Sequence, residues 1–234
     1  MRIWCISDTH GKHWQLITPP SLDAIIVAGD YSNSRDRLKN YGETHDFLSW
    51  LDLVPCRDKI VVAGNHDIYT EYDRRIISEA GIEGLTYLEH SVGIIGKSPH
   101  SIKVFGSPYT PSFGQGWAFN RSRSKLDAYW QEIPPDIDIL VTHGPPKGIL
   151  DLSHNIDGHL EYCGDKALLN HVLRIRPRYH IFGHIHNTPE GDINHGIRQF
   201  NNLPITFVNA SCVTDREFDK GPSSNGVVIE FDNI

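Results

Sequence analysis

Short apolar runs that stop at polar residues recur along the chain. The first three are Arg2–Ser7, Asp23–Ala28 and Lys59–Ala63. Apolar runs of this length, rich in β-branched residues, are typical of buried strands. In an open α/β sheet, ligands bind beyond the carboxyl ends of such strands. The pattern therefore predicts an α/β sheet whose carboxyl edge carries the polar residues.

The rest of the chain continues this pattern. Further strands are predicted at Asp138–Thr142, Tyr179–Phe182, Ile205–Asn209 and Val227–Phe231, with a hairpin-like pair at Val92–Ile95 and Ile102–Ser107. Helices are predicted at Asp36–Leu53, Glu71–Ala80, Ser124–Glu132 and Gly164–Ile175, the second ended by Gly81. Gly11–Leu22 reads mainly as loop. Gly106–Asn120 is too rich in Gly, Pro and aromatic residues for a helix, and long ordered loops of this kind are often functional.

Length and composition favour a single domain. The 234 residues are enough for a full core and fit one domain over residues 1–234 better than two small ones. The net charge of −7 argues against a general affinity for nucleic-acid backbone, without excluding a local basic lip. The four cysteines form no Cys-x-x-Cys pair, which favours a reduced, cytoplasmic setting. With no signal-type or membrane-length apolar stretch, we expect no membrane partner.

Residues with metal-binding side chains follow five of the predicted strands. They are Asp8, His10, Asp30, Asn65, His66, Asp67, His143, His184 and His186. All offer oxygen or imidazole donors, a set that suits Mn²⁺, Fe²⁺, Co²⁺ or Zn²⁺ better than Ca²⁺ or a structural zinc. They are too many for one ion, whereas two ions bridged by a carboxylate would use them fully. Gly64-Asn65-His66-Asp67 alone fits a turn equally well, but three such strand ends in one half of the chain favour a site.

In order, these residues resemble the five motifs of the calcineurin-like metallophosphoesterases. The motifs are Asp8-x-His10, Gly29-Asp30, Gly64-Asn65-His66-Asp67, His143 and Gly183-His184-x-His186. A narrower similarity to the metallophosphoesterase-domain-containing (MPPED) group is carried by Gly106–Asn120, Thr142-His143-Gly144-Pro145-Pro146 and Asn209-Ala210-Ser211. His184 and Asp67, which members of that group can replace, are both present. The resemblance implies an α/β fold with a two-layered β-sandwich flanked by α-helices, in four αββα layers.

The resemblance also implies a role for each donor. One ion takes Asp8, His10 and His186, a second takes Asn65, His143 and His184, and Asp30 bridges both. Mn²⁺ is favoured as the ion, with Fe, Co, Ni or Zn as alternatives. His66 then lies over the phosphate as a catalytic residue that stabilises developing charge or protonates the leaving oxygen, and Asp67 fixes its tautomer.

The implied activity is hydrolysis of phosphodiesters by attack of a metal-bridging hydroxide on phosphorus. Cyclic nucleotides are candidate substrates within this reading. One alternative is a phosphomonoesterase or nuclease that acts on nucleic-acid ends. An alternative of another class is a metal-loaded scaffold that binds a partner without turnover. The partner is in each case a phosphoester, a nucleotide or a nucleic-acid end, and the oligomeric state stays open.

Candidate substrate contacts lie in two loops. Tyr109, Phe113, Trp117 and Phe119 are candidates for stacking on a base, with Arg121 and Arg123 receiving phosphate. The competing interpretation is that two of the four rings only pack the loop onto the sheet. Asn33 and Arg35, just after Asp30, are further candidates for phosphate contact.

Overall fold

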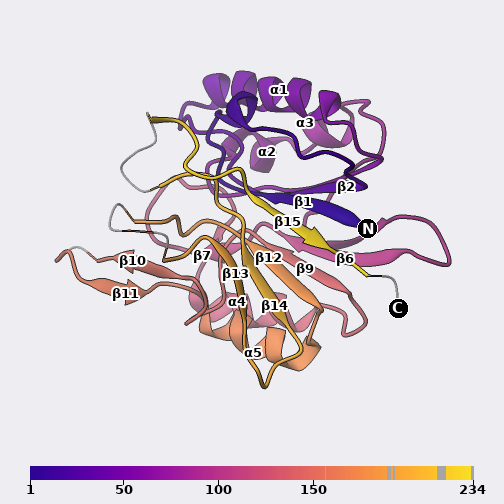
Figure 1. Cartoon of the computed structure of the whole chain (residues 1–234). Helices are drawn as coiled ribbons and strands as arrows, with labels where there is room; N and C mark the ends of the chain where they lie inside the picture. The colour runs from indigo at the N-terminus through magenta and orange to yellow at the C-terminus, as the bar shows by residue number, and fades with distance from the viewer. Residues whose placement is uncertain (156, 189–190, 192, 215–219, 233–234) are drawn as a thin grey trace.

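Two sheets form the centre of the structure, a computed structural model that describes residues 1–155, 157–188, 191, 193–214 and 220–232 (Figure 1). The elements in the first part of the chain are β1 Arg2–Ile6, η1 His13–Gln15, β2 Ala24–Ala28, α1 Arg37–Leu53, β3 Asp58–Val62, α2 Ile68–Tyr72, α3 Arg75–Ser78, β4 Leu85–Tyr87, β5 Ser91–Ile95 and β6 Ile102–Ser107. Those that follow are β7 Thr110–Pro111, β8 Asn120–Arg121, α4 Arg123–Gln131, β9 Ile139–Thr142, β10 Leu152–His154, β11 Leu160–Tyr162, α5 Lys166–Ile175, β12 Tyr179–Phe182, β13 Gly196–Gln199, β14 Thr206–Asn209 and β15 Val227–Glu230.

The first sheet has the strand order β15-β1-β2-β3-β4, and the second has the order β13-β14-β12-β9-β6-β5. In the first sheet β1 to β4 run parallel and only β15 is antiparallel. In the second, β6, β9, β12 and β14 run parallel, and the edge strands β5 and β13 are antiparallel. The carboxyl ends of the parallel strands therefore gather at one edge of each sheet.

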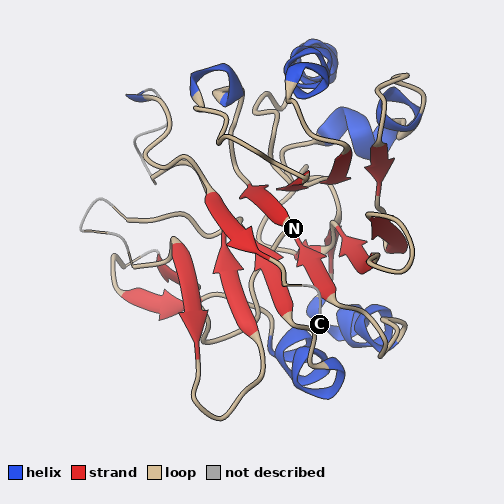
Figure 2. Ribbon diagram, turned by 45° about the vertical axis from the view of Figure 1, so that its right-hand side comes forward, coloured by secondary structure: helices blue, strands red, loops and turns tan. Residues whose placement is uncertain are grey.

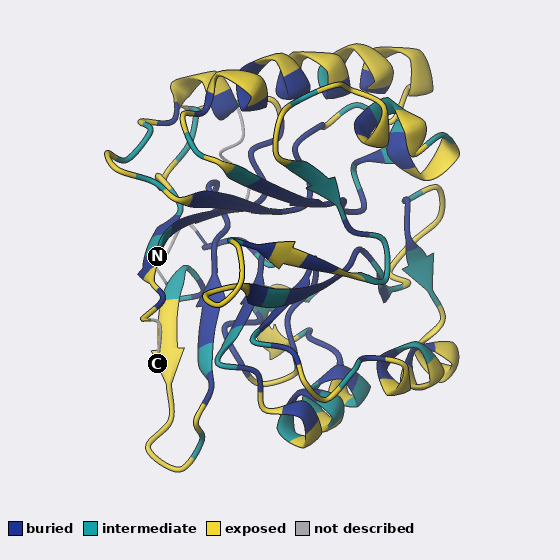
Figure 3. Ribbon diagram, turned by 90° about the vertical axis from the view of Figure 1, so that its right-hand side faces the viewer, coloured by how far each residue is buried: buried dark blue, intermediate teal, exposed yellow. Residues whose placement is uncertain are grey.

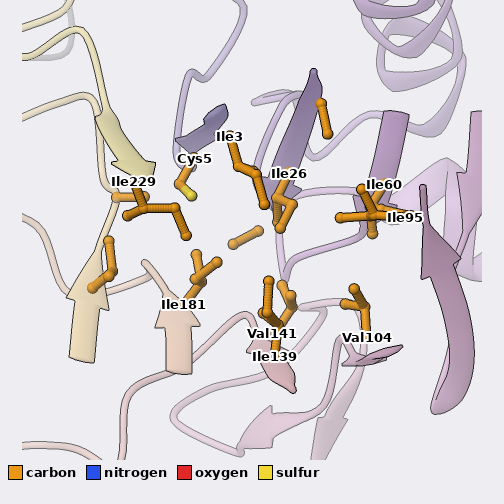
Figure 4. Packing of buried hydrophobic residues seen from close by; sticks show 14 of the residues in the cluster. Ile3, Cys5, Ile26, Ile60, Ile95, Val104, Ile139, Val141, Ile181 and Ile229 are labelled. Carbon is orange, nitrogen blue, oxygen red and sulfur yellow. The ribbon is translucent and has the colours of Figure 1, made fainter. Parts of the chain in front are cut away.

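Apolar residues fill three layers between the elements. Ile3, Ile26, Ile60, Val141 and Ile181 belong to the cluster where the two sheets face each other (Figure 4). A second cluster packs α1 and its neighbours against the first sheet, and a third packs α4 and α5 against the second. The helices lie on the two outer faces and turn their exposed sides to solvent (Figures 2 and 3). The predicted four-layer αββα arrangement is confirmed.

The predicted helix Glu71–Ala80 is wrong in its extent, because α2 and α3 are separate. Asp73 interrupts the helix in an extended conformation, with φ −147°. Its carboxylate accepts hydrogen bonds from the backbone N–H and the guanidinium of Arg75, at 3.1 and 2.6–2.8 Å. Such local side-chain bonds compete with the helix.

Six short strands, β4, β7, β8, β10, β11 and β13, were not predicted. The Gly106–Asn120 loop is ordered as predicted, and β7 pairs with β8 across its base. Within the described residues, no helix is long and apolar enough to cross a membrane.

Candidate metal centre

The candidate ligands follow β1, β2, β3, β9 and β12, at the edge where both sheets meet. They form three groups, within each of which the ligand atoms lie within 4.8 Å of one another: Asp8, His10 and His186; His10, Asp30 and His66; and Asp30, His143 and His184. Asn65 joins them through its side-chain oxygen, 2.9 Å from Nε2 of His143. Residues up to 178 positions apart in the sequence thus converge in one site.

Four of these residues adopt the left-handed backbone conformation. The φ angles are +54° for Asp8, +43° for His10, +54° for Asp30 and +66° for His184. This conformation costs roughly 1–2 kcal/mol for each non-glycine residue. Strained backbone at one location is typical of functional sites, since folding stability alone would not retain it.

Glycines allow the strand ends to approach one another. A Cβ on Gly64 would collide with the carboxylate and backbone N–H of Asp30, and one on Gly183 would collide with Ser7 and Asp8. A Cβ on Gly29 would collide with His143 and Gly64. The glycines before Asp30, Asn65 and His184 are therefore required by close packing around the site.

The ring of His143 is oriented by the backbone. Its Nδ1–H donates to the carbonyl oxygen of Ala28 at 2.8 Å. Because a carbonyl oxygen can only accept a hydrogen bond, Nδ1 must carry the proton. Nε2 then faces Asn65 and lies 3.3 Å from Oδ2 of Asp30. Burial lowers the pKa of His143, but the charge and hydrogen bond of Asp30, together with Asp8 and the Ala28 carbonyl oxygen, outweigh burial and raise it to about 9. Nε2 of His143 therefore lies in negatively charged surroundings, which favour a bound proton or cation.

The carboxylates of Asp8 and Asp30 are held in the ionised form. Burial raises the pKa of Asp8, but His186, with Nε2 at 3.3 Å, and His143 together outweigh burial and lower it to about 2. For Asp30, burial is likewise outweighed by His143 and His66, so its pKa lies well below the usual range. Ionised carboxylates are the form that binds cations.

His10 and His184 are held neutral, since burial lowers the pKa of each to about 3. Neutral imidazole is the form that binds a metal. Anionic oxygen and neutral nitrogen donors thus lie together without a thiolate. The residues present fit divalent ions of the Mn²⁺, Fe²⁺ or Zn²⁺ type.

His66 is half-buried above this group of ligands. Nδ1 lies 3.1 Å from the carbonyl oxygen of Asn33, to which it donates, and this leaves Nε2 as a proton carrier. Its ring centroid lies 4.6 Å from that of His10 and 4.5 Å from that of Trp117. The backbone N–H of His66 donates to Oδ1 of Asp30 at 2.7 Å, which fixes the residue to the proposed bridging ligand.

The prediction that Asp67 fixes the tautomer of His66 was wrong, because Asn33 does so. The buried carboxylate of Asp67 accepts hydrogen bonds from the backbone N–H groups of Asp30, Gly64 and Ser32 at 2.6–3.0 Å. It also accepts one from the Ser32 hydroxyl at 2.7 Å. Burial, reinforced by the charge of Asp30, raises its pKa to about 8. Asp67 is a positioning residue that joins the loops after β2 and β3.

Asn40 and Ser32 were missed by sequence reasoning. The Asn40 amide donates to Ser32 Oγ at 3.0 Å and to the carbonyl oxygen of His66 at 2.8 Å, and its own oxygen accepts from Tyr69 N–H at 2.8 Å. A fully buried asparagine on the apolar side of α1 could have drawn attention, because buried amides need partners. The partners of its side chain are 6 to 29 positions away and are not readable from the sequence.

Two rings of the aromatic loop lie at the site. Phe113 is 52% exposed, and its ring centroid lies 5.2 Å from that of His184. Trp117 contacts His66 and carries the guanidinium of Arg35 at 4.6 Å from its ring centroid. Arg35 also donates to the carbonyl oxygen of Gln115 at 2.7 Å, which attaches the loop to the segment after Asp30.

The other predicted contacts in this region have different surroundings. Phe119 is 1% exposed and packs in the core beneath the first sheet's helices, so the prediction that it binds substrate was wrong. The Tyr109 ring packs against Tyr129 and beneath the guanidinium of Arg121, which also pairs with Glu71 at 3.3 Å. Arg123 donates to the carbonyl oxygens of Cys163 and Gly164, just before α5. The local composition of the loop did not distinguish these positions.

A family model described as calcineurin-like phosphoesterase matches residues 1–188. The chain belongs to the calcineurin-like phosphoesterase family. A UPF0046 protein of Caenorhabditis elegans is 36% identical over 90% of this chain and 75% of its own length. Human metallophosphoesterase domain-containing protein 1 is 32% identical over 91% of this chain and 66% of its own length, in agreement with the predicted MPPED resemblance. Family membership supports metal-dependent hydrolysis of phosphoric esters.

The calcineurin-like domain also occurs within a longer relative. A protein of Emericella nidulans named probable rhamnogalacturonate lyase C is 42% identical over 80% of this chain, which spans only 17% of that protein. A solved structure superimposes with a TM-score of 0.65 over 90% of both chains at 14% identity. This structural likeness shows the fold alone.

Proposed function

We propose that this calcineurin-like phosphoesterase hydrolyses phosphodiesters with two divalent ions, Mn²⁺ being favoured. The observation that carries the proposal is the position of Asp30. Its Oδ2 lies 4.0 Å from Nε2 of His10 and 3.3 Å from Nε2 of His143, so one carboxylate reaches both halves of the site. In this proposal Asp8, His10 and His186 hold one ion, Asn65, His143 and His184 hold the other, and Asp30 is shared. When bound, such ions neutralise phosphate charge and lower the pKa of water.

The chain's own residues supply the remaining chemistry. His66 holds a proton at Nε2 for the leaving oxygen, because Nδ1–H is committed to the carbonyl oxygen of Asn33. Asp67 keeps the loops after β2 and β3 in register, so that His66 stays over the ligand group. General-acid assistance of this kind favours esters with a poor leaving group.

Phe113 and Trp117, which together we call the aromatic rim, favour a nucleotide-like leaving group. Phe113 and Trp117 offer flat faces beside His184 and His66, and stacking of a base on such rings is worth roughly 1–3 kcal/mol. Cyclic 2′,3′- or 3′,5′-nucleotides are the substrates that we propose first. Asn33 and Arg35 remain proposed contacts at the edge of the site, Asn33 through its side chain.

The test compares aryl esters on one protein preparation. Protein stripped with a chelator and reloaded with Mn²⁺ should hydrolyse bis-p-nitrophenyl phosphate faster than p-nitrophenyl phosphate. The Asp30→Ala variant serves as the control for contaminating phosphatase. A preparation that contains the metal but hydrolyses neither ester would contradict the proposal and favour a binding scaffold.

A second panel separates substrate classes. Cyclic nucleotides, 3′-phosphorylated oligonucleotides and single-stranded DNA are assayed with the same metal-loaded protein. Preference for the cyclic nucleotides supports the proposal. Preference for 3′-phosphorylated ends or single strands would instead assign the site to nucleic-acid processing.

A further inference from the structure

A cleft opens beside His10, next to the proposed metal centre. Its volume is about 540 Å³, and it is lined by His10, Gly11, Asn33, Lys39, Gly42 and Asp46. These residues come from α1 and from the loops after β1 and β2, whereas Phe113 and Trp117 belong to the aromatic loop. A group attached to a phosphate at the metal centre can therefore extend past His10 into a region separate from the aromatic rim.

One face of α1 forms the wall of this cleft. Lys39, Gly42, Glu43 and Asp46 follow the i, i+3, i+4, i+7 spacing and so share one side of the helix. Glu43 accepts hydrogen bonds from the backbone N–H groups of Asn33 and Ser34, both at 2.7 Å. The wall is thus fastened to the same loop whose Asn33 carbonyl orients His66.

Gly42 leaves the wall open. It lies within the 17-residue helix α1, where glycine is less favourable than alanine, and no atom lies within 4 Å of the place where its Cβ would stand. Packing of the protein therefore does not require glycine here. A side chain at this position would extend into the cleft.

Polar groups and one exposed ring surround the opening. Lys39 brings hydrogen-bond donors and Asp46 brings acceptors, a combination that suits the hydroxyl groups of a sugar. The Asp46 carboxylate is held by Nε2 of the buried His13 at 2.9 Å and by Nε1 of Trp14 at 3.0 Å, and Trp14 is 51% exposed. An exposed indole next to paired donors and acceptors suits a flat base or the apolar face of a sugar.

We propose that, in linear diesters, this cleft binds the ester group that remains on phosphorus, and that this group is a nucleoside. A cyclic nucleotide carries a single nucleoside and would occupy only one of the two regions. The proposal rests on the proposed phosphodiesterase function, because a monoester carries no such group. It assigns to Gly42 a role in substrate selection, with Lys39 and Asp46 as contacts of the nucleoside.

The test uses three esters that release the same p-nitrophenolate. They are p-nitrophenyl phosphate, methyl p-nitrophenyl phosphate and thymidine 5′-(p-nitrophenyl phosphate). In Gly42→Gln, kcat/KM for the thymidine ester should fall roughly tenfold, while the values for the other two should change by less than about twofold. Ser49→Gln is the matched control, because Ser49 is exposed on the same side of α1, two turns beyond Gly42, and does not line the cleft, so it should leave all three values unchanged.

Binding provides a measurement that does not depend on turnover. Isothermal titration with thymidine 5′-monophosphate should show weaker binding to Gly42→Gln than to the wild type or Ser49→Gln. Unchanged binding and unchanged thymidine-ester kinetics would overturn the proposal, as would an equal loss on all three esters. If the wild type hydrolysed none of them, the proposed function would fail, and the titration would still decide whether the cleft binds a nucleoside.

Discussion

His66 differs from the other histidines of the site in what its ring nitrogens face. Nδ1 is committed to the Asn33 carbonyl oxygen. His143, by contrast, points Nε2 at Asn65 and Asp30. At the residue scale this separates a proton carrier from a proposed metal ligand.

The His66→Ala variant should keep both ions and lose activity on cyclic nucleotides, whose leaving group is a poor one, by about 10²–10⁴-fold, the usual contribution of a general acid. Asp30→Ala should lose activity together with at least one ion, because it removes the shared ligand. Activity assays combined with metal analysis by mass spectrometry check both. Loss of an ion from His66→Ala would show that its assigned role is wrong.

The Asp67→Ala variant should be less stable by about 1–3 kcal/mol, the cost of leaving buried donors without an acceptor. Its carboxylate now receives backbone N–H groups from Asp30, Gly64 and Ser32. Urea unfolding measures the change, with His66→Ala, whose side chain is half-buried, as a control of small effect. Full stability in Asp67→Ala would contradict the positioning role.

His180 should make the protein less stable in acid. Burial lowers its pKa from 6.5 to about 3, while Nε2–H donates to Thr142 Oγ1 at 2.8 Å. Between these values the unfolded chain binds the proton and the folded chain does not. The contribution of His180 to the free energy of unfolding is therefore fully present above pH 6.5. It decreases by up to about 1.4 kcal/mol per pH unit as the pH falls toward 3.

The measurement compares urea unfolding at several pH values for wild type and His180→Gln, which keeps a hydrogen-bond donor but does not titrate. The variant should show a shallower loss of stability in acid. The exposed residue His45 supplies the control, since His45→Gln should leave the slope unchanged. An equal slope in His180→Gln and the wild type would disprove the assignment.

At the scale of elements, α1 serves the core and the site together. Phe47 and Leu51 pack on the first sheet, while Asn40 holds the loops that carry Ser32 and His66. A third face of α1 borders the cleft beside His10. Damage to the apolar face of this helix would therefore reach the site through Asn40.

The Gly42→Ala variant should be more stable by about 0.5–1 kcal/mol, because alanine favours the helix and meets no neighbour. Urea unfolding tests this, with Ser49→Ala as a comparison on the same helix. A destabilised Gly42→Ala protein would mean that the fold needs glycine there, and the argument for an open cleft wall would lose its basis.

At the scale of the whole molecule, the proposed metal centre joins the two sheets. Asp8, Asp30 and Asn65 follow strands of the first sheet, and His143 and His184 follow strands of the second. Each proposed ion would draw ligands from both, so metal binding and the packing of the sheets are coupled.

Removal of metal should consequently lower the melting temperature. Mn²⁺ at about 100 times its dissociation constant would add roughly 2.7 kcal/mol per site, and a chelator would remove it. Thermal unfolding with chelator, then with Mn²⁺ restored, measures the shift. Asp30→Ala should show a smaller response, and equal responses would argue against Asp30 as a shared ligand.

Much of the framework follows from the sequence alone. The apolar strands, the glycines before Asp30, Asn65 and His184, and the order of the donor residues were readable because each depends on local pattern. A strand that ends at a given residue must present the next residues at the sheet edge, whatever the rest of the chain does.

Only the tertiary structure decided which side chains face the site. Asp67 turns to Ser32 and the backbone rather than to His66, Phe119 enters the core while Trp117 does not, and the cleft beside His10 exists because α1 packs against two loops. The direction of a loop side chain depends on partners far away in the sequence. The distances between those partners are set by the packing of the two sheets and their helices, which no local pattern contains.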